Sequence, residues 1–477
     1  MQNAAAVVRA VADSDAVALV ALLQACAIGV RTPAATGIAI LANAPPGEAT
    51  NPMRESLAAA GAVPPLVAML RDGTAEEQAA AAEALWKLAR NTANRKTIAA
   101  AGGIEALVKL TRKGDAAGKS KGAIALWNVA CSDAANKARI TAAGGIAPLV
   151  ALVRDGDAEG KANAAGALRI LARGDDAISA AIRAAGGIAP LVTLVRDGDA
   201  AGKANAAGAL WSLAFSDAAN KAGITAAGGI EALVALVRDG DAAGKANAAV
   251  ALQNLAAADD ANKAAIRAAG GIDALVTLVR DGDAAGKANA AGALRIMAAA
   301  DDANKAAIRA AGGIEALVVL VRNGDADGKA NAAGALWDLA AGDDGITAAI
   351  RDAGGIEALV TLVRDGDAAG RSNAAGALCI LAADDVAKIV AMLDHPDLHV
   401  RLAAVSTLGQ LDAATLDQHA PALVARLADS DENVRRVAVS TLCKLDTATL
   451  AQHAPALVAR LEDSDSDVRW KAVSTLG

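Results

Sequence analysis

The chain has 477 residues and a formal net charge of -7; 54% of its residues are hydrophobic but only 1% are aromatic. Large enzyme cores normally use more aromatic volume, so this composition predicts alanine-rich helices, and the negative charge argues against a nucleic-acid partner. The four cysteines lie far apart and form neither a CxxC pair nor a disulfide framework. A reducing compartment follows, so we expect a cytoplasmic protein, with the nucleus as the alternative.

Residues 1–60 are expected to form a degenerate first repeat or cap. Helical apolar patterns cover residues 16–26 and 33–42, and residues 44–52, with two prolines and a glycine, predict an irregular loop. The longest apolar run, residues 16–30, is too short to span a bilayer, so no integral membrane association is expected.

Residues 61–385 are expected to form an array of 42-residue repeats, because a Gly-Gly pair recurs from Gly102 through Gly144, Gly186 and Gly228 to Gly354 at that step. One unit predicts helices over residues 188–196, 200–214 and 218–226, with the glycine pair supplying a sharp bend between units.

Two capping residues and two core residues are assigned within this unit. Gly198 is expected to end the first helix in a left-handed conformation, and the Asp199 carboxylate to cap the second. Leu210 and Leu213 are its predicted core positions. No single unit can bury its own apolar faces, so the units must stack as a solenoid.

The repeat length changes to 34 residues over 386–477, where VRLAAVSTL at Val400, VRRVAVSTL at Val434 and VRWKAVSTL at Val468 are equivalent. A helix over residues 386–393 follows the first array almost directly, which predicts one continuous rod. The fold class is therefore an all-α, right-handed solenoid of about nine longer repeats followed by about three shorter ones.

The last short repeat is expected to expose its apolar stripe. Val468, Ala472, Val473 and Leu476 have neighbours predicted on one side only. We therefore expect that the natural chain continues past Gly477, or that another chain covers this end, for instance through end-to-end association.

The longer repeat resembles the armadillo repeat. The resemblance rests on AGGIEALVALVRDG at residues 227–240 and NAAGALWSLA at residues 205–214. The shorter unit is similar to HEAT repeats in the motif D-x-x-V-R-x-x-A-V-x-x-L at residues 431–442. The resemblance implies a non-catalytic superhelix that binds partners along a concave face lined by the family's third helix, here residues 200–214 and their equivalents. The GALW and GALR segments look most like vacuolar and plant-type armadillo proteins.

The nuclear-import members of the family bind basic peptides through a Trp followed four residues later by an Asn on each lining helix. Here the Trp position holds other residues, among them Gly166, Gly208 and Gly334, and the Asn position keeps only Asn128 and Asn254. This departure from the pattern argues against binding of basic import signals.

A partner-binding groove is predicted from one register of the lining helices, just before the family's Asn position. Trp and Arg side chains often dominate binding energy, and Asn amides can hold an extended backbone. Trp211 and Phe215, and likewise Arg169 and Arg173, are spaced i, i+4 and are expected to stack. The alternative is that the Trp residues pack over the neighbouring repeat and the Asn residues cap or bridge helices. The candidate residues are Trp86, Trp127, Asn128, Asn163, Arg169, Arg173, Asn205, Trp211, Phe215, Asn247, Asn254, Asn289, Arg295, Asn331 and Trp337.

No catalytic, metal or cofactor site is predicted. Residues 323–328 resemble an EF-hand opening, but Gly334 stands where the bidentate Glu belongs. His395 and His399 flank Pro396 without a third ligand nearby. These loops are interpreted as caps and turns.

The sequence thus favours a scaffold or adaptor that binds an extended peptide or disordered segment. The alternatives are a transport-type cargo receptor, or the recognition arm of a ubiquitin ligase or other larger protein. The groove register holds more basic than acidic side chains, so an acidic or neutral ligand is expected rather than a basic one. Those residues are Lys87, Arg90, Arg169, Arg173 and Arg295, against Glu83 and Asp338.

Overall fold

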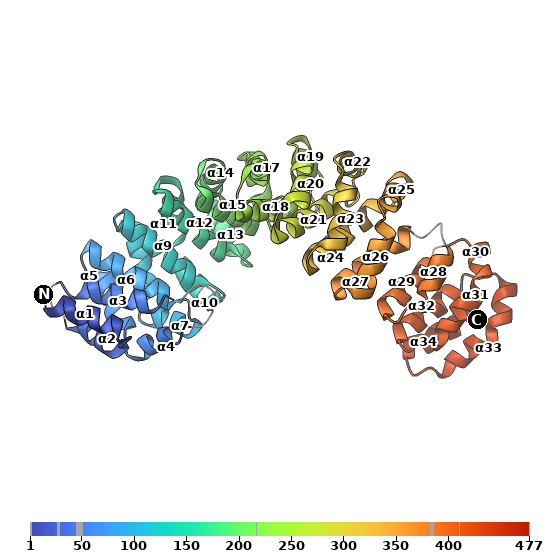
Figure 1. Ribbon diagram of the computed structural model, residues 1–477, viewed down its shortest axis with the longest axis horizontal. Coiled ribbons are helices and arrows are strands. Elements are labelled where there is room, and N and C mark those ends of the chain that lie inside the picture. The colour runs from blue at the N-terminus through green and yellow to red at the C-terminus, as the bar shows by residue number, and fades with distance from the viewer. Residues whose placement is uncertain are drawn as a thin grey trace. The chain divides into compact units, whose positions relative to one another are not determined.

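The computed structural model describes residues 2–25, 29–43, 51–215, 217–381, 386–409 and 411–476, which form helices joined by short turns (Figure 1). The chain divides into two compact units, Met1–Leu255 and Ala256–Gly477. The division lies within the 42-residue array. The predicted boundaries after residues 60 and 385 mark changes of repeat type and stay predictions.

The N-terminal part contains four helices, of which the first was not predicted. The expected helices over 16–26 and 33–42 correspond to α2 and α3, while residues 44–50 of the expected loop lie outside the described residues. Pro52, placed in that loop, instead begins a helix capped by the Asn51 side chain. The helices are α1 Gln2–Ala12, α2 Ala16–Gln24, α3 Arg31–Leu41 and α4 Pro52–Ala59.

The 42-residue repeats are built from three helices, which we call the first, long and short helices; for the repeat of α26 and α27 the described residues include only the first two. The first helices are α5 Val63–Asp72, α8 Gly103–Lys113, α11 Ile146–Asp155, α14 Ile188–Asp197, α17 Gly229–Asp239, α20 Gly271–Asp281, α23 Gly313–Asn323 and α26 Gly355–Asp365. The long helices are α6 Ala75–Leu88, α9 Ala116–Ala130, α12 Ala158–Ala172, α15 Ala200–Ala214, α18 Ala242–Ala256, α21 Ala284–Ala298, α24 Ala326–Ala340 and α27 Ala368–Leu381. The short helices are α7 Thr92–Ala100, α10 Ala134–Ala142, α13 Asp176–Ala184, α16 Ala218–Ala226, α19 Asp260–Ala268, α22 Asp302–Ala310 and α25 Asp344–Asp352.

The caps of the long helix α15 agree with the sequence at one position and differ at another. The Asp199 carboxylate accepts a hydrogen bond from the Gly202 N–H at 2.7 Å, as predicted. The left-handed conformation predicted for Gly198 is wrong, because its backbone is extended, with φ -72° and ψ 171°. Glycine is needed there for space: a Cβ would lie 2.6 Å from the Leu194 carbonyl oxygen.

The Gly-Gly pair forms the bend between repeats, and glycine is required at its two positions for different reasons. Gly186 has a φ of +72°, a left-handed conformation that side chains with a Cβ rarely adopt. Gly187 has an ordinary φ, but a Cβ on it would lie 2.8 Å from Ile182 Cγ2. The bend therefore depends on conformation at the first glycine and on close packing at the second.

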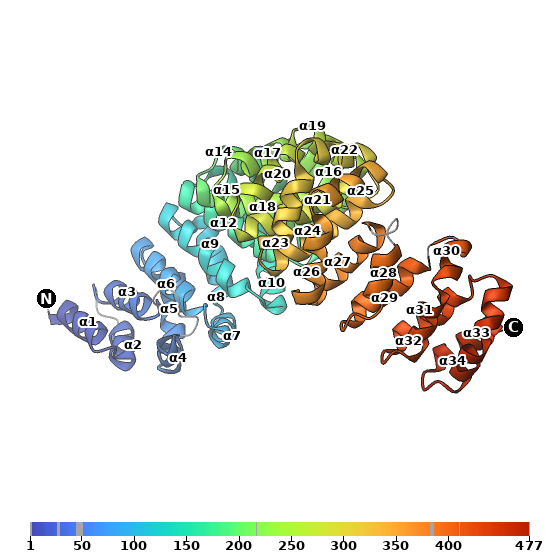
Figure 2. The same cartoon turned by 45° about the vertical axis from the view of Figure 1, so that its right-hand side comes forward.

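The core of each unit lies where consecutive long helices pack on one another. In the N-terminal unit α12 packs between α9 and α15, as the turned view also shows (Figure 2). Leu210 and Leu213 of α15 are 0% and 1% exposed, which confirms them as core residues. Alanine and glycine facing the neighbouring helix permit this close approach.

The 34-residue repeats form the end of the second unit and share one hydrophobic core. Helix α27 packs directly on α29, so within this unit the two repeat types stack without an intervening domain. The helices are α28 Val386–Met392, α29 Leu398–Leu408, α30 Ala413–Gln418, α31 Ala420–Ala425, α32 Glu432–Leu442, α33 Thr447–Val458 and α34 Ser466–Leu476, with 3-10 turns Arg426–Ala428 and Ala459–Glu462.

Buried ion pairs join consecutive 34-residue repeats. Arg401 donates to both carboxylate oxygens of Asp429, from Nε at 2.7 Å and from Nη2 at 2.8 Å. Arg435 holds Asp463 in the same way, at 3.0 and 2.8 Å. Burial alone would raise the pKa of each aspartate, but the arginine hydrogen bonds and charge hold both pKa values below the ordinary one.

Only part of the apolar stripe predicted to be exposed on the last helix, α34, is accessible to solvent. The expectation that Val468 and Ala472 would have neighbours on one side only, and so be exposed, is wrong, since both are 0% exposed within the unit's own core. Val473 and Leu476 are 60% and 37% exposed, as expected, and Trp470 is 67% exposed beside them. Association through this end stays a prediction.

Candidate functional site

The predicted register residues lie on the long helices and are all half-buried. Trp86, Trp127, Arg169 and Trp211 come from α6, α9, α12 and α15 of the N-terminal unit. Arg295 and Trp337 occupy the same register on α21 and α24 of the second unit. Each of these side chains therefore keeps part of its surface accessible while packing against its own unit.

The buried part of these side chains lies over a glycine of the next long helix. A Cβ added to Gly166 would lie 2.5 Å from Cε3 of Trp127, and one on Gly376 would lie 2.8 Å from Cδ2 of Trp337. These glycines stand where the import members of the family carry Trp. The aromatic side chain of one repeat thus covers the position from which the next repeat would have presented its own.

The arginines of the register lie in the same way. A Cβ on Gly208 would lie 2.8 Å from Cδ of Arg169, and one on Gly334 would lie 2.8 Å from Nη1 of Arg295. The packing alternative weighed from the sequence therefore applies to Trp and Arg alike. It leaves their exposed faces available to a ligand.

Cations accompany the indole rings of the N-terminal unit. Lys87 Nζ lies 3.8 Å and Lys121 Nζ 5.9 Å from the centre of the Trp86 ring. The guanidinium carbon of Arg169 lies 5.3 Å from the centre of the Trp211 ring. These are cation–π distances, so the recorded partner of Trp211 is Arg169 of the preceding repeat rather than Phe215.

The residues four positions beyond the register end the long helices instead of continuing their faces. Phe215 and Arg173 are the C-terminal caps of α15 and α12, and Phe215 is 68% exposed. Phe215 keeps helical backbone dihedrals, with φ -60° and ψ -44°, but the described residues include no ring contact between it and Trp211. Phe215 and Arg173 thus lie at the rim of the long helices.

Backbone carbonyls at the C-terminal caps of several long helices are bound by cations from the preceding repeat. Lys137 Nζ donates to the Arg173 carbonyl at 2.6 Å and Lys263 Nζ to the Ala299 carbonyl at 2.9 Å. A cation at a helix C-terminus satisfies free carbonyls and offsets the helix dipole. This ladder was not recognised in the sequence, although a Lys recurs at the fourth position of most short helices.

The predicted Asn row bridges neighbouring long helices. Asn205 donates from Nδ2 to the Ala162 carbonyl at 3.0 Å, and Asn247 donates to the Ala204 carbonyl at 2.9 Å. Asn331 and Asn373 make the corresponding bonds to the Ala288 and Ala330 carbonyls, whereas Asn163 donates to the Ser120 hydroxyl at 2.9 Å. Asn289 lies at the same position of α21. The bridging alternative therefore applies to this row, because each amide uses one of its N–H groups in a hydrogen bond within the protein.

The two positions kept from the import pattern also make internal hydrogen bonds. Asn128 donates to the Ile124 carbonyl of its own helix at 2.9 Å. Asn254 donates to the Trp211 carbonyl at 3.3 Å. Both residues are half-buried, so they lie beside the register without forming a ladder of free amides.

A second set of Asn residues, missed in the sequence, is buried in the short helices. Asn220 and Asn304 are both 0% exposed and donate to the carbonyls of Leu213 and Met297, each at 3.0 Å. These carbonyls belong to the last turn of a long helix, where no intrahelical donor is available. Their 42-residue spacing was the available signal. In two repeats Ile178 and Ile346 occupy this position, and the hydroxyl of the following Ser179 or Thr347 donates to the Ala172 or Ala340 carbonyl.

Burial and neighbouring positive charges lower the pKa values of cations in and beside the register. Burial lowers the pKa of Arg169, and the neighbouring charge of Arg173 lowers it further. Burial also lowers the pKa of Lys87, with Glu83 partly opposing the effect. Arg295 differs from Arg169 because its Nε is paired with Asp338 Oδ2 at 3.1 Å.

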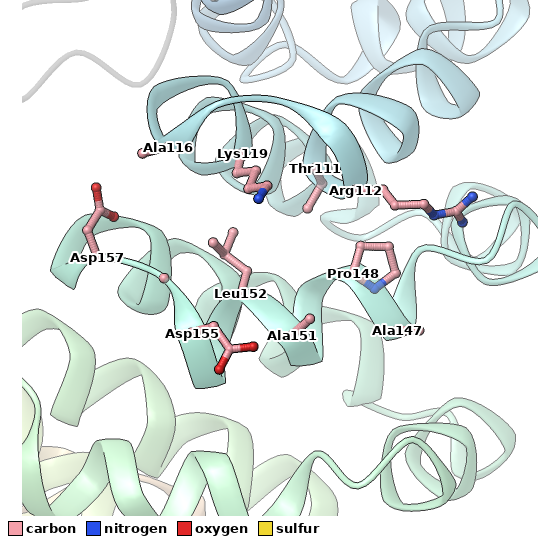
Figure 3. A pocket seen from close by; sticks show the side chains of 11 residues that line it. Thr111, Arg112, Ala116, Lys119, Ala147, Pro148, Ala151, Leu152, Asp155 and Asp157 are labelled. Atoms are coloured by element: carbon pink, nitrogen blue, oxygen red, sulfur yellow. The ribbon is translucent and has the colours of Figure 1, made fainter.

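A separate cavity of about 500 Å³ lies between the first helices α8 and α11 and the start of α9 (Figure 3). Lys119, Thr111 and Leu152 face its interior, whereas Asp157 lies at its edge. A similar cavity of about 420 Å³ occurs one repeat later. Neither cavity is lined by a register residue, and the lining side chains do not form a cluster that would bind a particular chemical group. We therefore assign the two cavities no function.

The motifs set aside in the sequence are capping loops. Asp325 and Asp157 each accept a hydrogen bond from the N–H three residues on, at 2.8 Å. Within the described ranges, no three His, Cys, Asp or Glu side chains are grouped as a metal site would require.

The described helices were also compared with the length and hydropathy of a membrane span. No single helix of that part of the chain meets both requirements; the α13–α14 pair does so by length and composition, but it is bent by 82°.

Comparison with known proteins gives two family matches. The armadillo/β-catenin-like repeat family matches residues 133–173, 175–215, 218–257, 259–299, 301–341 and 343–383. HEAT repeats match residues 420–477. No curated protein matches the sequence.

Solved structures similar to this chain include engineered proteins from the Northeast Structural Genomics Consortium. One is 32% identical, with a TM-score of 0.71, over 92% of this chain and 98% of that chain. Another is 36% identical, with a TM-score of 0.48, over 50% of this chain and 96% of the other. The first likeness extends through both repeat types.

Proposed function

Because the chain belongs to the armadillo/β-catenin-like repeat family, we propose that it is a non-catalytic scaffold that binds an extended peptide along its long helices. Solenoids of armadillo and HEAT repeats are typically interaction proteins. The binding face is the register of α6, α9, α12 and α15 in the N-terminal unit. A cytoplasmic location, with the nucleus as the alternative, belongs to the same proposal.

The observation that carries the proposal is the half-exposed state of the register side chains. Trp127 and Arg169 are held against the next helix by one side, at Gly166 and Gly208. A side chain already fixed in this way loses little conformational entropy when a ligand covers its other side. Rigid aromatic and arginine side chains of this kind are the usual energetic centres of interfaces.

The ligand we propose is acidic or neutral. Arg295 is balanced by Asp338, so the second unit contributes little net charge to this register. In the N-terminal unit Lys87, Arg169 and Arg173 outnumber Glu83. Local charge of this sign steers an acidic segment toward the face although the whole chain is negative.

The test is a fluorescently labelled peptide array with acidic, neutral and basic sets of equal length. Wild-type protein is expected to retain acidic or neutral peptides. Trp211→Ala combined with Phe215→Ala is expected to weaken their binding at least tenfold, since an anchor contributes about 2–4 kcal/mol.

Trp470→Ala is the matched control, because Trp470 is an exposed tryptophan outside the register. It is expected to bind as wild type does, and circular dichroism should show the same helix content in all three proteins. Equal binding by the double variant, or enrichment of Lys/Arg-rich peptides, would show that the proposed face or ligand is wrong.

A further inference from the structure

The two Arg–Trp sites of the 42-residue array differ in how the arginine charge is balanced. Arg169 and Trp211 are equivalent to Arg295 and Trp337, three repeats later in the sequence. In the later pair Asp338 follows Trp337 and binds Arg295 at 3.1 Å. In the earlier pair the residue after Trp211 is Ser212, whose hydroxyl donates to the Gly208 carbonyl of its own helix.

The earlier site also carries a second cation. Arg173 stands where the later site has Ala299, and its charge lowers the pKa of Arg169. The structure records no ion pair for either guanidinium among the described residues. The chain thus places two like charges together without the counter-ion that it supplies at the equivalent position.

The first guanidinium is also held in place. Its carbon lies 5.3 Å from the centre of the Trp211 ring, and a Cβ on Gly208 would approach Arg169 Nε to 2.9 Å. Lys137 binds the Arg173 carbonyl at 2.6 Å and so fixes the end of α12 that carries the second guanidinium. Guanidinium groups donate hydrogen bonds in a fixed fork, so two neighbouring ones form a good binding site for a planar or tetrahedral oxyanion.

We propose that Arg169 and Arg173 bind the phosphate of a phosphorylated serine or threonine in the extended ligand, with Trp211 alongside. The comparison between the Arg169 and Arg295 sites indicates the charge of the group that Arg169 and Arg173 would bind. One carboxylate balances one arginine at Arg295, so two arginines fit a group that carries close to two charges and offers three acceptor oxygens. This inference rests on the proposed peptide-binding function and adds the chemical class of one ligand residue.

The experiment uses three peptide libraries that share random flanking residues and differ only at the central position: phosphoserine, glutamate or serine. Fluorescence polarisation with the full chain is expected to give phosphoserine peptides about tenfold tighter binding than serine peptides, with glutamate between them.

Ser212→Asp supplies the missing carboxylate in the way Asp338 does, and is expected to reduce the phosphoserine preference to about twofold or less. Arg173→Ala, which introduces the residue of the equivalent repeat, is expected to reduce it as well. Because Arg173 is exposed, this variant tests the inference even if Ser212→Asp, at a buried position, impairs folding.

Asp338→Ser is the control, since it frees Arg295 where no second arginine is present, and it should leave the preference unchanged. Equal binding of the three libraries, or an unaltered preference in Arg173→Ala, overturns the inference while peptide binding itself stands. Competition by inorganic phosphate as strong as that by the phosphopeptides also overturns it, because the site would then select a free anion. The failure of every unphosphorylated and phosphorylated peptide to bind would instead remove the proposed function.

Discussion

Replacing Gly166 by alanine measures the packing of one repeat on the next. In a helix interior this change normally gains about 1 kcal/mol of stability. Here the new Cβ would lie 2.5 Å from Cε3 of Trp127, about 1 Å closer than an ordinary van der Waals contact. Overpacking of a rigid ring costs about 1–3 kcal/mol, so Gly166→Ala is expected to lower the free energy of unfolding by up to about 2 kcal/mol.

Gly208→Ala is the matched comparison one repeat later. Its Cβ would meet the side chain of Arg169, at 2.8 Å from Cδ, and would displace it from its place beside Gly208 by rotation about its side-chain bonds, which costs less than displacing a fused ring. The helix-propensity gain should therefore survive, and Gly208→Ala should be neutral or stabilising by up to about 1 kcal/mol. Both variants make the same Gly-to-Ala change at equivalent positions. The difference between their free energies of unfolding therefore measures the effect of the neighbouring side chain.

A double-mutant cycle with Trp127→Ala isolates the contact. Once the indole is removed, Gly166→Ala is expected to stabilise by about 1 kcal/mol, as in an unobstructed helix. Urea unfolding followed by circular dichroism gives the midpoints, and hydrogen exchange at α9 and α12 localises the change, which matters in a repeat array. A Gly166→Ala protein as stable as Gly208→Ala, with no coupling to Trp127, would refute the packing argument.

Three further predictions concern stability and association. Asp463→Asn is expected to cost about 3 kcal/mol in urea unfolding, because it leaves the buried Arg435 guanidinium without its partner; Asp467→Asn, at an aspartate that is 69% exposed, should cost under about 0.5 kcal/mol. The lowered pKa values of Asp429 and Asp463 mean that their ion pairs contribute fully above about pH 4 and are lost as pH falls through those lowered values, so Asp463→Asn should flatten the acid side of the stability profile, and an unchanged profile would contradict this. Asn304→Ala is expected to destabilise by about 2 kcal/mol, because it leaves the Met297 carbonyl buried without that donor, whereas the half-buried Asn331→Ala should cost less. Light scattering at rising protein concentration should show association that Trp470→Ser abolishes; a wild-type protein that stays monomeric throughout would make the end-to-end prediction wrong.

Local features of the fold were predictable because their causes lie within one repeat. Helices α15 and α16 begin and end where the sequence placed them, since the Asp caps and the alanine-rich apolar pattern are local signals. The Gly-Gly bend followed from backbone conformation in the same way. Gly198 was assigned incorrectly because glycine after a helix can be required either for a left-handed conformation or for lack of space for a Cβ. Only the position of the Leu194 carbonyl distinguishes these two causes.

The candidate site was less predictable because its contacts join residues of different repeats. The register could be listed from the sequence, but not that Trp127 would lie on Gly166 or that Arg169 would lie beside Trp211. The predicted pairing of Trp211 with Phe215 considered one helix alone, whereas the contact of Trp211 comes from Arg169 of the preceding repeat. The Asn row looked free for a ligand because periodicity shows which residues share a face, not what the adjacent helix offers them.

The hydrogen bonds between long helices have one further consequence, for the lengths that such a chain can tolerate. Asn331 and Asn373 each bind a carbonyl 43 residues before them, in the preceding repeat. If residues 313–354 were excised, Gly312 would join Gly355 to restore the glycine pair, and Asn373 would meet the Ala288 carbonyl in place of Ala330. Whole repeats can thus be removed without changing this spacing, whereas the loss of a single residue between a donor and its acceptor would move that donor away from its carbonyl. Recombination between copies can therefore lengthen or shorten the array while keeping these hydrogen bonds between long helices, although side-chain contacts such as that of Arg295 with Asp338 would be exchanged.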